Sequence, residues 1–304
     1  MAPDPSSVIR NPPPRQGARA FRYRLAAAWG FSLPAALVQF FFGWLPVAFA
    51  FVVAFQQYYF VKPPEPIGWK NFVDVAADPL VVNAFRNTFL YAALSVGLTF
   101  LIPVFVSILL MEMPGRTIRW MMILWFIPVA STASIAIWKY MYHFRLGLLN
   151  GMLTAVGLPP QKWLDDPNLA MMSLILPGII LFSPGLIYIA ALQNIPEELY
   201  EAAELEGAGF LQKVRTVTLP RMRPVIAMML IFSVIGSLQV FELPFIMTGG
   251  GPGYATQTVV MYVYSLAFAG YNLGKATALA VVLFFVIMAV ITLQRRLVRE
   301  NIDE

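Results

Sequence analysis

Six long runs without charged residues dominate this 304-residue sequence. They cover residues 29–55, 87–111, 120–138, 167–195, 224–241 and 276–294. Each run has about 18 residues or more, enough to cross a hydrocarbon layer of about 30 Å as a helix. Because only a helix satisfies its own backbone polar groups in lipid, the runs predict six transmembrane helices. Trp120 and Trp138, at opposite ends of the third run, are expected to be interfacial anchors.

The overall composition also indicates a membrane protein. Hydrophobic residues make up 59% of the chain, charged residues only 12%, and the mean hydropathy is +0.69, whereas a soluble protein carries about 25% charged residues. The absence of cysteine excludes disulfides, iron–sulfur clusters and thiolate chemistry. His143 is the single histidine, and a lone histidine favours an interfacial side chain over a metal site. The composition therefore predicts an all-α integral membrane protein without a metal.

The first 28 residues differ from the rest of the chain. All five prolines of this segment lie within residues 3–14, and five arginines lie between residues 10 and 24. We predict a flexible basic tail over residues 1–28 and a membrane domain over residues 29–304. The first apolar run follows a long leader without a convincing small-residue cleavage site, so it is expected to be a retained signal anchor.

The basic residues predict the orientation. With the N-terminus inside, fourteen of the 21 Lys and Arg residues fall in cytoplasmic segments, within residues 10–24, 116–119, 213–223 and 295–299. The positive-inside rule favours this arrangement, which makes both termini cytoplasmic. The same distribution accounts for the net charge of +5 through basic residues on the cytoplasmic side of a membrane. The charge therefore gives no reason to expect nucleic-acid binding. Two further apolar stretches, 146–156 and 259–269, are too short to span and are expected to form interfacial or re-entrant short helices on the outside.

The loop at 194–223 contains residues that favour the start and the end of a helix. Asn194 is a possible cap, Pro196 suits a first turn, and Glu197 and Glu198 face the positive end of the helix dipole. Apolar and small residues recur at helical spacing, namely Leu199, Ala202, Ala203 and either Leu205 or Glu206. Gly207 and Gly209 are expected to break this helix, and a second short helix is expected from Phe210 until Pro220 stops it.

Three environments could receive this acidic helix. A solvated amphipathic loop is the simplest. A membrane surface suits it poorly, because anionic lipid would repel its five glutamates. A protein groove lined with basic groups suits its charge and its small alanines best.

The same loop resembles a known family. Glu201-Ala202-Ala203, then Gly207 with Ala208, then Leu219-Pro220, is similar to the EAA signature of bacterial ABC importer permeases. Residues 163–167 (Trp-Leu-Asp-Asp-Pro) and 248–252 (Thr-Gly-Gly-Gly-Pro) resemble stretches of the maltose, glycerol-phosphate and multiple-sugar permeases. The resemblance extends from about residue 31 to the end of the chain.

The resemblance implies a type I ABC importer permease fold in the bacterial inner membrane, driven by a separate ATPase dimer that binds ATP and magnesium. It implies that 194–223 is a coupling loop, in which Glu201 pairs with a basic group of the ATPase and Gly207 makes the bend. Ala202 and Ala203 would allow close approach. It further implies a homologous second permease and an extracytoplasmic solute-binding protein. That protein would contact Thr248, Gly249, Gly250, Gly251 and Pro252.

No catalytic constellation accompanies these features. Residues 270–276 are the nearest string to a phosphate loop, but their glycine spacing is one residue short and Ala276 replaces the required hydroxyl. The carboxylates of Asp165 and Asp166 are expected to be solvated or to cap a helix. We therefore expect a non-enzymatic subunit that binds no cofactor itself.

An ion-coupled secondary transporter is the main alternative, with a structural membrane scaffold as a weaker one. Ion-coupled transporters usually carry ionisable groups within their spans, and the six runs contain none.

A sugar pathway would need hydrogen-bonding side chains and aromatic faces. The candidates are Ser183 and Tyr188 in the fourth run, Ser233, Ser237, Gln239 and Glu242 around the fifth, and Ser131, Thr132 and Ser134 in the third. Serine and threonine in membrane helices more often bond to their own helix than to a substrate. Monosaccharides, disaccharides, oligosaccharides, polyols and glycerol phosphate all remain open as the solute.

Overall fold

The computed structural model describes residues 18–59, 63–129, 132–180 and 185–300. Over these ranges the regular secondary structure is helical except for one small sheet, in which β1 (Gln56–Gln57) pairs antiparallel with β2 (Glu65–Pro66). The chain divides into two compact units, Met1–Val52 and Val53–Glu304.

The described part of the smaller unit is one long helix made of α1 (Ala18–Gln39), a π-helical turn η2 (Phe40–Trp44) and α2 (Leu45–Val53), whose last residue is the first of the larger unit. It begins at Ala18, so the prediction of a flexible tail up to residue 28 is wrong for residues 18–28. The prolines that argued against a helix all precede residue 15, and the alanines and arginines that follow favour one. Residues 1–17 lie outside the described ranges. From Ala27 to Val53 the helix is long and apolar enough to cross a membrane.

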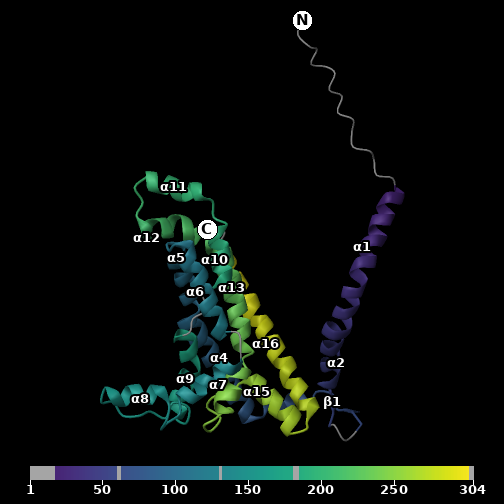
Figure 1. Ribbon diagram of the computed structural model, residues 1–304. Helices are drawn as coiled ribbons and strands as arrows, with labels where there is room; N and C mark the ends of the chain where they lie inside the picture. Colours follow the sequence, from purple (N-terminus) through teal and green to yellow (C-terminus); the bar gives the residue numbers. More distant parts are fainter. Residues whose placement is uncertain (1–17, 60–62, 130–131, 181–184, 301–304) are drawn as a thin grey trace. The chain divides into compact units, whose positions relative to one another are not determined.

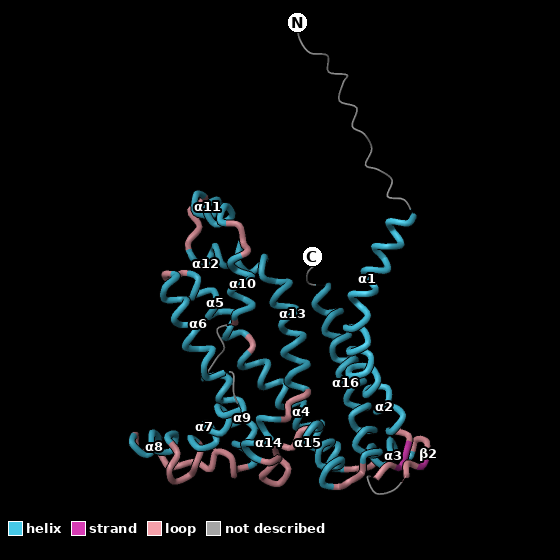
Figure 2. The backbone as a smooth tube through the Cα atoms, turned by 45° about the vertical axis from the view of Figure 1, so that its right-hand side comes forward, coloured by secondary structure: helices cyan, strands magenta, loops and turns pink. Residues whose placement is uncertain are grey.

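The larger unit is a bundle of helices, shown in Figure 1. In order they are α3 (Lys70–Ala76), α4 (Pro79–Thr99), α5 (Leu101–Met111), α6 (Gly115–Val129), α7 (Thr132–Met141), α8 (Leu148–Ala155), α9 (Pro167–Ile180), α10 (Leu186–Gln193), α11 (Glu197–Leu205), α12 (Phe210–Lys213), η3 (Val214–Thr218), α13 (Leu219–Leu238), α14 (Glu242–Thr248), α15 (Val259–Tyr264), η4 (Ser265–Ala269) and α16 (Leu273–Glu300), where η marks a π-helix. Figures 1 and 2 show α11 and α12 at one end of this unit, and α8 and α15 at the other.

Four helices in the described ranges are long and apolar enough to span a membrane: Ala27–Val53, Pro79–Met111, Phe210–Leu238 and Leu273–Arg296. They match four of the six predicted spans. The predicted span 120–138 is divided between α6 and α7, and the predicted span 167–195 between α9 and α10, on either side of residues outside the described ranges. Six spans therefore remain a prediction.

The boundaries of two spans differ from those predicted. The helix of the second span begins at Pro79 rather than residue 87 and so includes Arg86, because Asp78 caps it and Pro79 occupies its first turn. The fifth begins at Phe210 rather than residue 224, so Pro220 does not stop a short helix as predicted. The π-turn η3 lies directly before Pro220, where the missing N–H of proline would interrupt regular helix pairing.

The core of the larger unit contains two apolar clusters. One holds Tyr91, Trp138, Tyr142, Met171, Leu174, Ile175 and Met247, and the other holds Val104, Ile108, Tyr188, Leu192 and Met222. Trp138 is therefore a core residue and not the interfacial anchor that its position predicted, whereas Trp120 is exposed as expected. The predicted external helix over 259–269 is present as α15 and η4, but Val259, Met261 and Tyr262 are buried.

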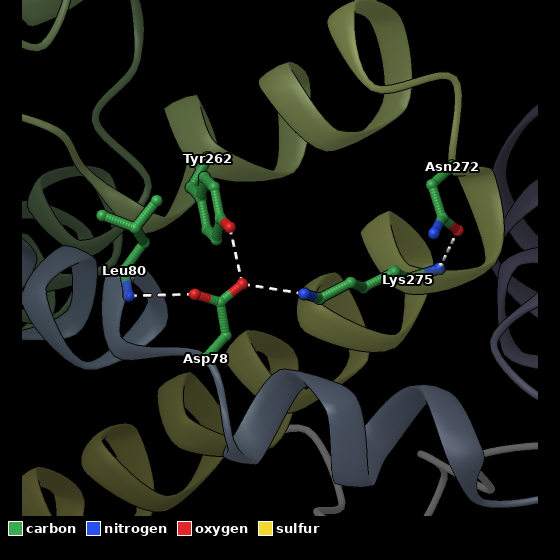
Figure 3. A network of polar contacts seen from close by, with 5 residues as sticks. All are labelled: Asp78, Leu80, Tyr262, Asn272 and Lys275. Carbon is green, nitrogen blue, oxygen red and sulfur yellow. Dashed lines mark hydrogen bonds and ion pairs between the residues drawn. The ribbon is translucent and has the colours of Figure 1, made fainter.

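A polar network at the α8 end joins three segments that are distant in sequence (Figure 3). Asp78 accepts the Leu80 N–H at 3.0 Å through Oδ1. Its Oδ2 accepts the Tyr262 hydroxyl at 2.6 Å and pairs with the Lys275 ammonium at 2.7 Å. The Asp78 side chain is only 12% exposed, so this pair is well shielded from water. The network fixes the start of α4 against α15 and α16.

We expect Asp78→Asn to destabilise the larger unit by about 1–3 kcal/mol, because a shielded hydrogen bond to a charged group is lost. Asparagine is itself a good N-cap, so the loss reports the Lys275 and Tyr262 contacts rather than the cap. Thermal unfolding of the purified protein in detergent measures it. Asp74→Asn, at an exposed position of α3, is the matched control. Equal unfolding temperatures for the two variants would contradict the assignment.

The same carboxylate predicts a pH dependence. Burial raises the pKa of Asp78, but the hydrogen bonds from Lys275, Tyr262 and the Leu80 N–H lower it more, so the pKa lies below its ordinary value. A carboxylate with a lowered pKa contributes stability above the unfolded value of about 3.9 and loses it as the pH falls through the folded value. The difference between wild type and Asp78→Asn should therefore shrink below about pH 4.

Candidate functional site: an acidic helix and a glycine loop at opposite ends

The acidic helix α11 ends in a defined backbone motif. Gly207 has φ +81°, the left-handed conformation, and its N–H donates to the Glu204 carbonyl at 2.9 Å. The Ala208 N–H donates to the Ala203 carbonyl at 2.9 Å. These two bonds form a Schellman motif, in which a glycine terminates the helix. A Cβ added to Gly207 would meet nothing within 4 Å, so the backbone angle, not space, requires glycine here.

The start of α11 partly matches its prediction. Glu197 and Glu198 occupy the first turn, as expected. Pro196 is the N-cap residue, whereas Asn194, the predicted cap, donates its side-chain amide to the Ala190 carbonyl at 2.7 Å. Asn194 therefore stabilises the C-terminal end of α10, and α11 begins only after Pro196.

Two side-chain contacts fasten α11 to the helix that follows it. The hydroxyls of Tyr200 and Thr218 lie 3.0 Å apart, and Thr218 is buried within η3. Glu204 pairs with the Lys213 ammonium of α12 at 2.6 Å. Neither contact was predicted. The partners are 18 and nine residues apart in the sequence, which is not a spacing that brings side chains together within one helix. They meet because the chain turns at Gly207.

A cavity of about 670 Å³ lies between α11, α12 and the ends of α5 and α10. Four carboxylates line it (Glu112, Glu197, Glu201 and Glu204), together with the Lys213 ammonium. Lys213 is engaged by Glu204, whereas Glu201 has no hydrogen bond or ion pair within the described part of the chain. The cavity is therefore acidic, and Glu201 is available to a basic partner.

The helices that line the acidic cavity also carry exposed apolar side chains. Leu205 is 91% exposed, Leu211 on α12 is 70% exposed, and Ala202 is also exposed, while Ala203 and Ala208 are half-buried. Leu219 and Pro220 lie where α13 continues from η3. Exposed leucines beside a cluster of carboxylates form a surface that suits a protein groove better than water.

The glycine loop (residues 248–257) is a rigid structure at the other end. Gly249, Gly250 and Gly253 have positive φ angles of 61°, 90° and 56°, a left-handed conformation that glycine adopts without steric cost. The Thr256 hydroxyl is fully buried and donates to the Gly251 carbonyl at 2.8 Å. Asn87 of α4 donates to the carbonyls of Tyr254 and Gln257 at 2.7 and 3.1 Å. Thr248, Gly249, Gly251 and Pro252 also line a pocket of about 460 Å³.

The predicted pathway residues have different environments. Tyr188 is 4% exposed within the second apolar cluster, which argues against its lining an open pathway. Ser237 is buried and donates to the Val234 carbonyl of its own helix at 2.9 Å, while Ser233 is half-buried. Gln239 and Glu242 are exposed where α13 gives way to α14. Ser183 and Ser131 lie outside the described residues.

An aromatic cluster beside Gln239 and Glu242 was not predicted. The rings of Phe241 and Phe245 stack at 4.9 Å with an interplanar angle of 20°. Tyr264 contacts both, at 5.3 and 5.4 Å, and Phe268 at 4.9 Å. Two aromatic pairs at four-residue spacing, 241/245 and 264/268, are the sequence signal that could have indicated it.

Other expected roles are structural. The Asp166 carboxylate accepts the Asn168 N–H at 2.8 Å at the start of α9, which confirms helix capping. His143 accepts the backbone N–H groups of Arg145 and Leu146. Within the described ranges, no three His, Asp or Glu side chains are grouped so that they could hold a metal ion.

Apolar helices of membrane-crossing length, with an acidic helix at one end of the larger unit and a glycine loop at the other, define a helical membrane protein. Residues 75–302 match the family described as the binding-protein-dependent transport system inner membrane component, and the chain belongs to this family. It is accordingly a permease subunit of an ABC importer and not the subunit that hydrolyses ATP.

Individual relatives agree with this assignment. The sulfoquinovosyl glycerol transport system permease protein SmoG of Agrobacterium fabrum is 34% identical over 244 residues, covering 78% of each chain. The trehalose/maltose transport system permease protein MalF of Thermococcus litoralis is 30% identical, covering 81% of this chain and 84% of that protein. A bacterial ABC transporter involved in alginate import shares the fold, with a TM-score of 0.81 over 93% of this chain at 22% identity. An ion-coupled secondary transporter is not favoured by these relationships.

Proposed function

We propose that this chain forms half of the translocation pathway for a sugar or sugar-like solute. A homologous second permease completes the pathway, an extracytoplasmic binding protein delivers the solute, and a separate ATPase dimer supplies the energy from ATP and magnesium. The observation that carries the proposal is the acidic helix α11 with its glycine end at Gly207, in a chain that belongs to the family of importer inner-membrane components.

The geometry of α11 supports a coupling role. Glu201 lines an acidic cavity and has no partner among the described residues, and Leu205 is exposed on the same helix, so an ATPase groove with basic and apolar groups would complement both. The contact of Tyr200 with Thr218 joins α11 to η3, and the contact of Glu204 with Lys213 joins α11 to α12. Both α12 and η3 lead directly into α13. Movement of α11 would therefore pass into α13, the helix that carries Ser233 and Ser237.

The side chains where α13 ends support the proposal that the solute is sugar-like. Gln239 and Glu242 offer hydrogen-bonding groups, and the cluster of Phe241, Phe245 and Tyr264 offers aromatic faces close by. Sugars require both in an otherwise apolar site. Several relatives carry sugar names, including SmoG, MalF and an arabinooligosaccharide permease of Bacillus subtilis that is 28% identical.

The orientation is part of the proposal. We place six spans in the inner membrane with both termini and the coupling loop in the cytoplasm, following the distribution of Lys and Arg. The glycine loop then lies outside, where its fixed backbone suits contact with the binding protein through Thr248, Gly249, Gly250, Gly251 and Pro252.

Uptake into membrane vesicles tests the proposal. Vesicles that contain this chain, the second permease and the ATPase should accumulate a neutral sugar only when they enclose ATP and when the binding protein is present outside. An imposed proton or sodium gradient without ATP should give no accumulation. Uptake driven by an ion gradient alone would contradict the proposed function.

A further inference from the structure

The short helix α8 buries a polar side chain and leaves several apolar side chains exposed. Asn150 is 3% exposed and points into the protein, whereas Leu148, Met152 and Val156, which share one side at four-residue spacing, are all more than half exposed. Leu146 and Leu158, just before and after the helix, are exposed as well. A helix surrounded by water would show the opposite pattern.

Hydrogen bonds of Asn150 fix this orientation. Its amide nitrogen donates to the carbonyls of Phe144 and Gln161 at 3.0 and 2.9 Å. Its oxygen accepts the Gln161 N–H and the Trp163 indole N–H, both at 2.9 Å. All the bonding capacity of the amide group is thus used, in three bonds with Gln161 and Trp163 and one with Phe144, to fix the orientation of α8. The apolar side cannot turn inward without breaking these bonds.

An apolar groove of about 420 Å³ lies beside the exposed side of α8. It is lined by Ile137, Trp138 and Met141 of α7, Leu149 and Met152 of α8, and Ile180 of α9, with Ser134 as the one hydroxyl side chain. Figures 1 and 2 show α8 directed away from the long helices and across their axes, at the end opposite α11. The groove therefore lies on the side of the helical unit where α8 projects, at the end opposite α11.

The residues around the groove match the headgroup region of a bilayer. Arg145 lies three residues before α8 and Lys162 seven residues after it, and both are exposed and form no ion pair within the described residues. Tyr140 is exposed and stacks on His143 at 6.4 Å. Apolar side chains flanked by basic and aromatic residues are typical of a helix lying at a membrane surface.

We propose that the groove beside α8 binds an anionic phospholipid of the leaflet opposite the coupling loop. One acyl chain would occupy the space between α7, α8 and α9, while Arg145 and Lys162 hold the phosphate. The inference uses the membrane placement of the proposed function, but it does not depend on which solute is carried.

Spin labelling tests the position of α8. The chain contains no cysteine, so Met152→Cys and Thr154→Cys each give a single labelling site, two residues apart on different sides of the helix. In the assembled transporter in lipid nanodiscs, a nitroxide at position 152 should collide several-fold more with oxygen than with a water-soluble nickel reagent. The label at position 154 should show the reverse preference. A preference for nickel at position 152 would overturn the proposal. So would protection from both reagents with cross-linking to the second permease.

Lipid retention tests the headgroup contacts. Native mass spectrometry of the purified transporter should detect bound phosphatidylglycerol, and Arg145→Gln with Lys162→Gln should weaken it by about fivefold for each residue. Lys70→Gln, an exposed lysine of α3, is the matched control. Equal phosphatidylglycerol retention in the double variant and the control would overturn the proposal. ATP-dependent uptake measured on the same preparations separates this outcome from a failure of the proposed function.

Discussion

Gly207→Val should abolish uptake while the protein still reaches the membrane in normal amounts. A β-branched residue in the left-handed conformation is strained by roughly 1–2 kcal/mol, because its Cβ meets its own backbone. The space around Gly207 is empty, so the helix end would relieve the strain by leaving the Schellman geometry. Helix α11 would then lose its fixed direction relative to α12 and α13.

Gly209→Val is the matched control for this prediction. Gly209 belongs to the same turn and also has open space around it, but its φ is −75°, which any residue adopts. The Gly209→Val variant should therefore keep most of the wild-type uptake. Gly207→Asn should lie between the two, because asparagine tolerates the left-handed region better than valine. Equal uptake by the valine variants at positions 207 and 209 would show that the backbone angle at Gly207 has no role in coupling.

Glu201→Lys should reduce uptake to background by a different route. The substitution reverses the charge of a side chain that lines the acidic cavity and has no partner within the described residues. Against a basic groove, the new ammonium group would face like charges, a juxtaposition that costs several kcal/mol. The expected result is a loss of ATPase co-purification with no loss of this chain from the membrane.

Glu206→Lys makes the same change of charge at the end of the same helix. Glu206 does not line the cavity, and a cation near a helix C-terminus is favourable. This variant should co-purify with the ATPase as wild type does. If Glu201→Lys also retained the ATPase and its uptake, α11 would not be the docking element.

Sequence patterns predicted the local structure of these regions well. Charge-free runs located four helices of spanning length, and the glycines at 207 and 249–250 occupy the left-handed conformations that their residue type favours. Carboxylates at positions 197 and 198 lie in the first turn of α11. These features depend on neighbouring residues, so a single sequence contains the necessary information.

Contacts between distant residues were not predictable in the same way. Lys275 pairs with Asp78 across 197 positions, and no local pattern in the sequence indicates this contact. The burial of Trp138 depends on α9 and α14 packing against α7, so its sequence position at the end of an apolar run suggested the surface. The burial of Asn150 in α8 follows from its bonds with residues 161–163, which no helical periodicity encodes.

ATP hydrolysis by the reconstituted transporter tests the coupling claim most directly. The complex of this chain, the second permease and the ATPase should hydrolyse ATP slowly alone and faster with solute-loaded binding protein. In the Gly207→Val complex the basal rate should persist while the stimulation disappears, because α11 no longer transmits the signal from the glycine-loop end. Full stimulation in that variant would contradict the role of α11 and Gly207 in coupling.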